Sequence, residues 1–283
     1  MLISRLHLNR LARYPAPARI GIFLLSLLFL WLPIAVPIYR IWGSGNTVSI
    51  VTMLVLYSEF IFLLRLWGQK VHQQSHPLKS YGLIKTKKNW LELLRSIIVG
   101  LLSLFCLFIF EGWLGWLAWQ MPAEFLTNII LEGFIISLGV GFAEELLFRG
   151  WLVDELPWHY GNKVSLWVSS TLYAGLHFVK PLAEIWRTLP SFPGLLLLGL
   201  TLGWARFIHQ GRLGFPIGLH AGFVWGYYII NVGNLVRYSG QVPDWVTGID
   251  SNPLAGGVGL LFLSLIALSL WQIPGIPQRQ NHN

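Results

Sequence analysis

The sequence contains eight apolar windows close to the length that crosses a lipid bilayer. A spanning helix needs about 20 predominantly apolar residues, because the hydrocarbon core is roughly 30 Å thick. Only 11% of the 283 residues are charged, whereas soluble domains average about 25%. We therefore predict an integral, multi-pass, all-α membrane helix bundle of about eight transmembrane helices. The windows are Ile20–Ile41, Val48–Leu66, Leu93–Trp119, Leu126–Val153, Val164–Val179, Pro193–Ile208, Leu213–Val232 and Leu254–Ile273.

The positive charge is distributed unevenly between the two sides that these windows define. The net charge is +8, with 20 Lys and Arg residues. All but four of them fall on the side of the termini and of the Gly68–Asn89 loop, and positive residues concentrate on cytoplasmic loops. The sequence thus predicts cytoplasmic termini and contact with anionic lipid, and the basic excess requires no nucleic acid. The exceptions are Arg40, Lys180, Arg187 and Arg237.

Two adjacent acids, Glu144 and Glu145, lie inside the fourth apolar window. A charge near the bilayer centre costs roughly 2.5–3.5 kcal/mol on insertion scales, so an intramembrane carboxylate marks a candidate functional site. Glu145 and Arg149 are four residues apart and share a helix face, where they can form an ion pair. Glu144 points about 100° away and has no charged partner along the helix. This pattern leaves Glu144 free for chemistry.

Two later windows carry histidines at membrane depth. Tyr173 and His177 are four residues apart, so both can face one cavity. His220 lies in the seventh window, and small residues beside both histidines would let helices approach closely. They are Ala174, Gly175, Ala221 and Gly222. Taken singly, an intramembrane Glu–Arg pair or His is at least as often structural as catalytic. The presence of the Glu–Arg pair and both histidines on three predicted spans indicates an active site.

The order of these motifs resembles that of a known family. Glu-Glu-x-x-x-Arg, then an aromatic residue followed by x-x-x-His, then a motif that begins with His, resembles the CAAX prenyl endopeptidase and bacteriocin-processing (CPBP, Abi) intramembrane proteases. Glu144, Glu145 and Arg149 match the first motif in full. Tyr173 stands where the family usually has Phe, and Val224 stands where it usually has Asn or Asp.

The resemblance implies an intramembrane endopeptidase that hydrolyses a peptide bond of a membrane-associated or prenyl-type substrate. In the family, the first Glu and the second-motif His are thought to activate water, while the third motif stabilises the oxyanion. Carried over, Glu144 is the general base with His177, and His220 is an oxyanion donor, with Glu145, Arg149 and Tyr173 in support. Val224 cannot donate a hydrogen bond, so Asn234 or a backbone amide is an alternative donor.

Several alternatives remain open. We predict no cofactor, because the sequence has no His-Glu-x-x-His motif, but Glu144, His177 and His220 would also form a His₂Glu zinc set. A proteolytically inactive membrane scaffold or immunity factor, and a proton-coupled transporter, are the competing functions. Against a transporter, the two halves of the chain show no internal repeat.

The sequence divides into three parts of one membrane domain. Residues 1–123 hold N-terminal transmembrane helices and the basic cytoplasmic loop, residues 124–235 the catalytic core, and residues 236–283 the C-terminal helix and tail. Cys106 is the only cysteine, so no intramolecular disulfide forms. The expected location is a prokaryotic cell membrane, with another internal membrane as the alternative. The expected partners are a peptide or membrane-protein substrate and the bilayer.

Overall fold

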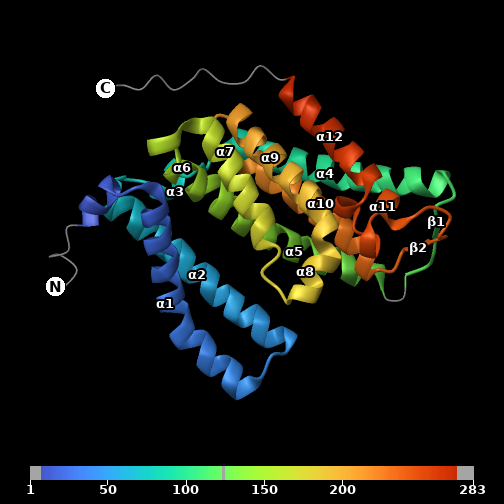
Figure 1. Ribbon diagram of the computed structural model, residues 1–283, viewed down its shortest axis with the longest axis horizontal. Coiled ribbons are helices and arrows are strands. Elements are labelled where there is room, and N and C mark those ends of the chain that lie inside the picture. The colour runs from blue at the N-terminus through green and yellow to red at the C-terminus, as the bar shows by residue number, and fades with distance from the viewer. Residues whose placement is uncertain (1–7, 123–124, 273–283) are drawn as a thin grey trace.

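The computed structural model describes residues 8–122 and 125–272, excluding the side chains of Asn46 and of residues 157–160. Both chain termini, whose side of the membrane the sequence predicts, lie outside the described residues. The described elements are arranged as a helix bundle with one small sheet (Figure 1). In chain order they are η2 (Leu8–Arg13), α1 (Ala16–Trp42), α2 (Asn46–Lys70), α3 (Pro77–Ser80), α4 (Lys87–Trp113), β1 (Leu117–Trp119), α5 (Leu126–Glu145), η3 (Leu146–Leu152), α6 (Val153–Glu155), α7 (Pro157–Leu176), α8 (Leu182–Thr188), η4 (Leu189–Ser191), α9 (Phe192–Ile208), α10 (Gly214–Val232), β2 (Val236–Tyr238), α11 (Asp244–Thr247), η5 (Ile249–Ser251), η6 (Pro253–Ala255) and α12 (Gly257–Trp271).

Helix α10 lies at the centre of the bundle, packed against α4, α5 and α9. Its contact with α4 depends on glycine. A Cβ atom at Gly222 would collide with the carbonyl oxygen of Ile97, and one at Gly100 would lie 2.5 Å from the carbonyl oxygen of Leu219. The prediction that Gly222 permits close helix approach is therefore confirmed. It is wrong for Gly175, because no atom lies within 4 Å of where its Cβ would be.

Each of the eight apolar windows contains a helix, with local differences at the ends. The third window was predicted to be apolar helix through Trp119, but α4 ends at Trp113, and Gly115 then adopts a φ of +77°. Leu117–Trp119 instead forms strand β1, which pairs antiparallel with β2. The fourth window continues from α5 into a π-helical segment, η3, where hydrogen bonds run from residue i to i+5.

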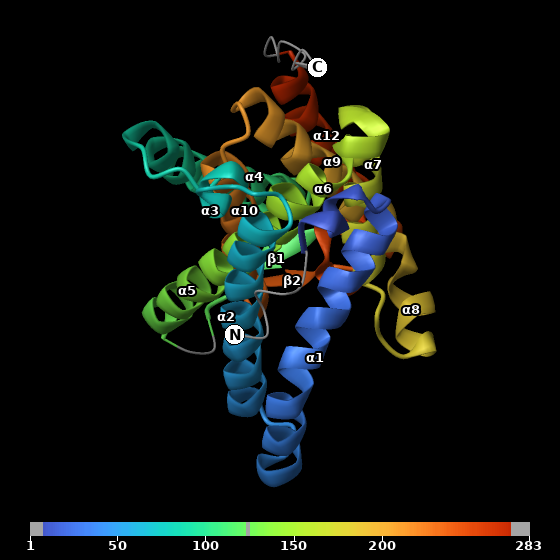
Figure 2. The same cartoon turned by 90° about the vertical axis from the view of Figure 1, so that its left-hand side faces the viewer.

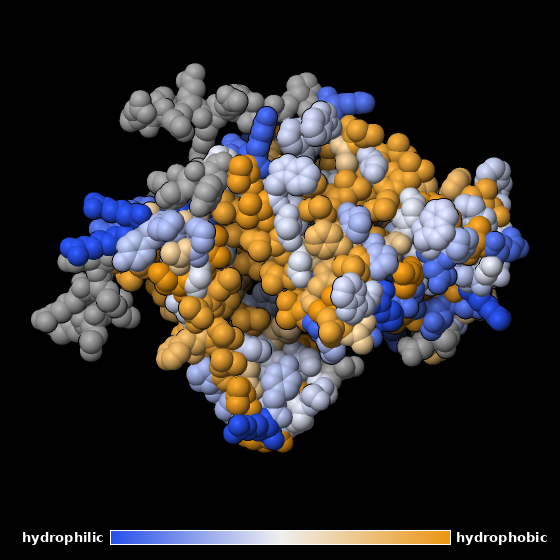
Figure 3. Space-filling model, in the orientation of Figure 1, coloured by the Kyte–Doolittle hydropathy of each residue, from blue (hydrophilic) through white to orange (hydrophobic). Residues whose placement is uncertain are grey.

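By length and composition, five helical segments within the described residues could cross a membrane: Ala16–Trp42, Thr47–Lys70, Lys87–Trp113, Leu126–Glu155 and Leu182–Ile208. The apolar helix α12 has 15 residues, roughly 22 Å, against a core of about 30 Å. Figure 3 shows the most hydrophilic residues mainly around the margins of this face, with apolar residues over much of the area between them. An all-α membrane protein is confirmed, while the count of eight crossings stays a prediction.

The α1–α2 hairpin extends away from the other helices (Figures 1 and 2). It is joined to them by the buried carboxylate of Glu155 in α6. Arg19 Nε donates to Glu155 Oε2 at 2.8 Å, Trp67 Nε1 donates to Oε1 at 2.7 Å, and His72 Nε2 lies 2.6 Å from Oε1. These contacts all occur where α1 begins and α2 ends, so the hairpin is attached to the bundle near one of its ends.

Topology provides the first prediction. A Ser75→Cys variant in a Cys106→Ala background should resist an impermeant thiol reagent in intact cells and react after permeabilisation, because the Gly68–Asn89 loop is predicted to be cytoplasmic. Ser75 is exposed, so accessibility does not limit labelling. Gln241→Cys, an exposed position after β2, is the matched control and should react in intact cells. The reverse pattern would invert the topology.

Candidate active site

A buried ion pair marks the junction of α5 and η3. Arg149 Nη1 lies 2.8 Å from Glu145 Oε1, and the two side chains are 1% and 0% exposed. Arg149 Nη2 also donates to the carbonyl oxygen of Gly199 in α9, at 3.2 Å. The ion pair that the four-residue spacing predicts is therefore present. It links α5 and η3 to the helix that packs against α7.

Glu145 has a second partner that the sequence did not indicate. His220 Nδ1 lies 2.9 Å from Glu145 Oε1, and since a carboxylate can only accept, Nδ1–H donates. The same oxygen therefore holds both Arg149 and His220. Glu145 fixes the orientation of the imidazole as well as neutralising the buried guanidinium. The other ring nitrogen, Nε2, faces Glu144, with 3.9 Å to Glu144 Oε2.

His177 lies directly after α7, which ends at Leu176, and its side chain caps the helix. Its Nδ1 is 2.7 Å from the carbonyl oxygen of Tyr173, so Nδ1–H donates and Nε2 is left as an acceptor in the neutral ring. Tyr173 is buried between the two imidazoles, with ring centroids 4.8 Å from His177 and 6.1 Å from His220. Arg149 Cζ lies 4.3 Å from the Tyr173 centroid, a cation–π distance. Tyr173 thereby sets the separation of the histidines.

Glu144 is the member of the acid pair that makes no hydrogen bond to a described residue, and its charged neighbour is His220, with 3.9 Å between Oε2 and Nε2. The Glu144 side chain is 27% exposed, and Oε2 is buried with no hydrogen-bond partner among the described residues. Along the segment Leu126–Glu155 it lies roughly 16 Å from the end at Glu155 and 27 Å from the end at Leu126. Glu144 therefore lies closer to the Glu155 end of this segment than to its Leu126 end.

Glu144, Tyr173, His177 and His220 line one cavity of about 370 Å³. Apolar side chains, most of them leucine or phenylalanine, make up just over half of its lining residues. Other polar lining residues come from α4, α10, the stretch between α7 and α9, and the segment before α12. They are Ser103, Tyr227, Lys180, Thr188, Ser191 and Asn252. An apolar cavity with a few convergent polar groups is the usual form of a substrate site.

Val224 and the alternative donor Asn234 differ in their placement. Val224 lines the cavity one helical turn from His220. Asn234 is in the turn after α10, where Nδ2 lies 3.5 Å from the carbonyl oxygen of Val232 and the backbone carbonyl accepts from Gln120. Fourteen residues separate Asn234 from His220, roughly 20 Å along a helix. The structure therefore brings Val224 to the site and leaves Asn234 outside the cavity.

A metal site would place stricter demands on the same side chains. A catalytic zinc site uses three protein ligands with room for water. No group of three or more His, Cys, Asp or Glu side chains in residues 8–122 and 125–272 is arranged to hold a metal ion. The zinc alternative at Glu144, His177 and His220 thus gains no support from the arrangement of the side chains and needs a solution test.

A helical membrane protein with two imidazoles and a carboxylate lining one cavity belongs to the class of candidate intramembrane enzymes. The family model described as type II CAAX prenyl endopeptidase Rce1-like matches residues 126–226. This segment runs from the start of α5 into α10, and the match over it supports an intramembrane protease of the CPBP family. No curated protein and no solved structure matches the chain.

Proposed function

We propose that this protein is an intramembrane endopeptidase that hydrolyses a peptide bond with water activated by Glu144 and His177. A protease family implies a peptide substrate in a membrane. The observation that carries the catalytic assignment is the single cavity that collects Glu144, His177 and His220 from three helices. Glu144 is suited to the role of base because its carboxylate lines this cavity with no ion pair to Arg149.

The reaction requires one water and no covalent intermediate. Glu144 removes a proton from the water, whose oxygen attacks the carbonyl carbon while the carbonyl π electrons move onto oxygen. His177, with Nδ1–H committed to Tyr173, accepts a hydrogen bond from the same water through Nε2. When the tetrahedral intermediate collapses, the C–N bond breaks, and the proton held by Glu144 passes to the leaving amine.

We assign His220 the role of stabilising the oxyanion that forms from the substrate carbonyl oxygen. In its doubly protonated form, Nδ1–H binds Glu145 and Nε2–H faces the cavity, where it can donate to developing negative charge. Glu145 and Arg149 keep this ring in place. Their role is therefore positioning, and it is exerted through His220.

The substrate can be identified from its cleavage products. Membrane peptides should be compared by mass spectrometry between cells that carry the wild-type protein and cells that carry Glu144→Gln. We expect new peptide termini that depend on Glu144, within or beside hydrophobic segments. Identical peptide sets would support the inactive scaffold instead. A proton-coupled transporter predicts Glu144-dependent proton flux in proteoliposomes with no new termini.

A second prediction concerns whether cleavage depends on a metal ion. Because the proposed mechanism uses Glu144 and His177 on water alone, peptide cleavage by purified protein should keep most of its rate after EDTA or 1,10-phenanthroline treatment. The measurement is the rate before and after chelation, with added Zn²⁺ as the control. Loss on chelation and recovery with Zn²⁺ would instead support a His₂Glu zinc site.

A further inference from the structure

One polar residue of the cavity wall lies outside the segment that matches the family. Asn252 stands between η5 and η6, and it lines the same cavity as Glu144, His177, His220 and Val224. It is partly buried. Because residues 126–226 carry the family match, the match assigns no role to Asn252. Its chemistry has to be derived from its own contacts.

The contacts of Asn252 leave its amide nitrogen free. Asn252 Oδ1 accepts a hydrogen bond from the backbone N–H of Leu254 at 3.1 Å and caps η6. An N–H donor requires the oxygen on that side, which fixes the orientation of the amide. The NH₂ group carries two donors, and no described residue accepts a hydrogen bond from it. Asn252 therefore presents N–H donors beyond those that its structural role uses.

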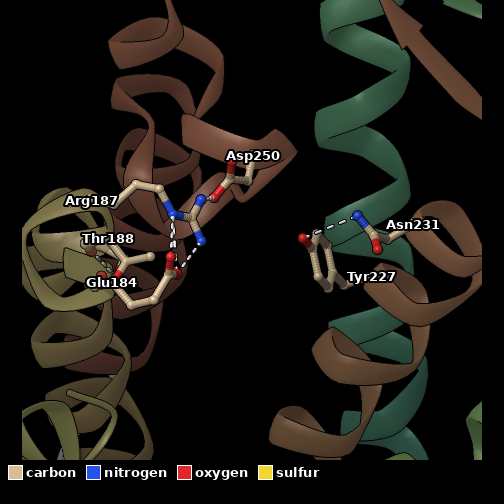
Figure 4. A network of polar contacts seen from close by, with 7 residues as sticks. Glu184, Arg187, Thr188, Tyr227, Asn231 and Asp250 are labelled. Atoms are coloured by element: carbon tan, nitrogen blue, oxygen red, sulfur yellow. Dashed lines mark hydrogen bonds and ion pairs between the residues drawn. The ribbon is translucent and has the colours of Figure 1, made fainter. Parts of the chain in front are cut away.

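The turn that carries Asn252 has an unusual backbone. Asp250 and Ser251 adopt φ values of +54° and +60°, a left-handed conformation that non-glycine residues rarely take. Such backbone conformations are strained and cluster at functional sites. Arg187 in α8 pairs with the Asp250 carboxylate and also with Glu184 (Figure 4). This ion-pair network joins the turn to α8 and so restricts where Asn252 lies.

The hydroxyl donors of the cavity wall are largely committed. Ser103, Thr188 and Ser191 each donate to a carbonyl oxygen three or four residues earlier, at 2.7 Å. Tyr227 Oη accepts from Asn231 Nδ2 at 3.3 Å, so its own O–H is not used in that contact (Figure 4). Outside the three motifs, the described neutral side chains of the wall with a donor to spare are thus those of Asn252 and Tyr227. Of these two, Asn252 is the one with its orientation fixed.

We propose that Asn252 is a catalytic residue that donates a hydrogen bond from Nδ2 to the substrate carbonyl oxygen as it becomes the oxyanion. Asn252 stabilises the oxyanion together with His220, and it supplies the second hydrogen bond that the Val224 side chain cannot donate. The inference rests on the proposed endopeptidase function. Its donor differs from His220 in one respect: the amide carries N–H groups and no titratable proton.

The test starts from a library of fluorescence-quenched peptides presented to the purified protein in proteoliposomes. A peptide that the wild-type protein cleaves and Glu144→Gln does not is taken forward. Asn252→Asp keeps the oxygen that caps η6 and removes the N–H donors, and Asn252→Ala removes both without adding charge. We expect kcat to fall about 10²–10³-fold in both variants, with KM changed no more than a few-fold, because the bond forms in the transition state.

Three further variants separate this role from others. Tyr227→Phe tests the other spare donor of the same wall, and Asn128→Ala, which removes an exposed amide outside the cavity, is the control that should keep wild-type kcat. Val224→Asn in the Asn252→Ala background should recover part of the lost kcat. A phosphinic analogue of the cleaved peptide, which carries a tetrahedral anion, should bind more weakly to Asn252→Ala than to the wild-type protein, with peptide KM as the reference.

The outcomes are distinguishable. If Asn252→Ala keeps the wild-type kcat, the inference is overturned. If Asn252→Asp is slow in that case, the added negative charge explains its loss of kcat. Loss in Tyr227→Phe with normal Asn252→Ala assigns the donor to Tyr227. A raised KM with unchanged kcat makes Asn252 a binding residue and also overturns the inference. If the wild-type protein cleaves no peptide of the library, the endopeptidase proposal fails, and the inference fails with it.

Discussion

Replacing Glu144 by Gln should lower kcat for peptide cleavage by at least about 10²–10⁴-fold, the usual contribution of a general base. Gln has nearly the same shape and cannot take a proton from water. Folding should be unaffected, because Glu144 lies beside the cavity and makes no hydrogen bond to a described residue through its buried Oε2. The measurement is steady-state cleavage by purified protein, with melting temperature in detergent as the folding check.

The matched control for this variant is on the same helix. Glu132→Gln makes the same chemical change in α5, three turns earlier, at an exposed position. We expect wild-type kcat and melting temperature for it. Equal loss of activity in both variants would point to a general effect of charge on α5. Full activity of Glu144→Gln would remove Glu144 from the mechanism.

The second large effect concerns stability. Arg149→Met should destabilise the protein by about 3–5 kcal/mol, because it leaves the Glu145 carboxylate buried without its ion-pair partner. Glu145→Gln should have a similar cost, since the guanidinium is then unpaired and His220 loses its carboxylate acceptor. Unfolding in a denaturing detergent titration, together with folded yield by size-exclusion chromatography, measures both.

Arg187→Met provides the comparison. It removes an Arg–Glu pair of similar spacing, but the side chains are 47% and 45% exposed. Exposed ion pairs contribute about 0–1 kcal/mol, so this variant should keep nearly wild-type stability. If Arg149→Met were as stable as Arg187→Met, the buried pair would not be a structural requirement, and Arg149 would be free for another role.

The sequence predicted features that depend on spacing along one helix. Apolar windows located the long helices, because a bilayer sets their length. The i, i+4 spacing predicted the contact of Glu145 with Arg149 and placed Tyr173 beside His177, and these contacts are present. Local geometry alone decides such pairs.

Contacts between distant segments could not be predicted in the same way. Glu145 and His220 are 75 positions apart, and their hydrogen bond depends on how α5 and α10 pack. The small residues Gly141 and Ala221, which lie close together at that contact, were the available signal. Asn252 precedes Pro253, a common turn signal, but a turn signal does not indicate which cavity the turn will face.

The same limit applies to where helices end. His177 was predicted inside a span, whereas α7 ends at Leu176 and the imidazole caps it. The window continued because Phe178 and Val179 are apolar, although they lie in a turn. Hydropathy reports the surroundings of a residue and not its hydrogen bonding, so a cap made by a histidine side chain leaves no hydropathic signal.

The π-helical segment η3 has a consequence for how the molecule tolerates change. It stands between the acid pair at Glu144 and Glu145 and the carboxylate of Glu155, which holds the α1–α2 hairpin. Each residue added or removed there rotates everything beyond it by about 100°. A single deletion would turn Glu155 away from Arg19 even if the acid pair stayed in the cavity. The number of residues in η3 therefore fixes the angle about the helix axis between the acid pair, which lies at the cavity, and Glu155, which holds the α1–α2 hairpin. Insertions and deletions in η3 should be tolerated as poorly as substitutions in the site.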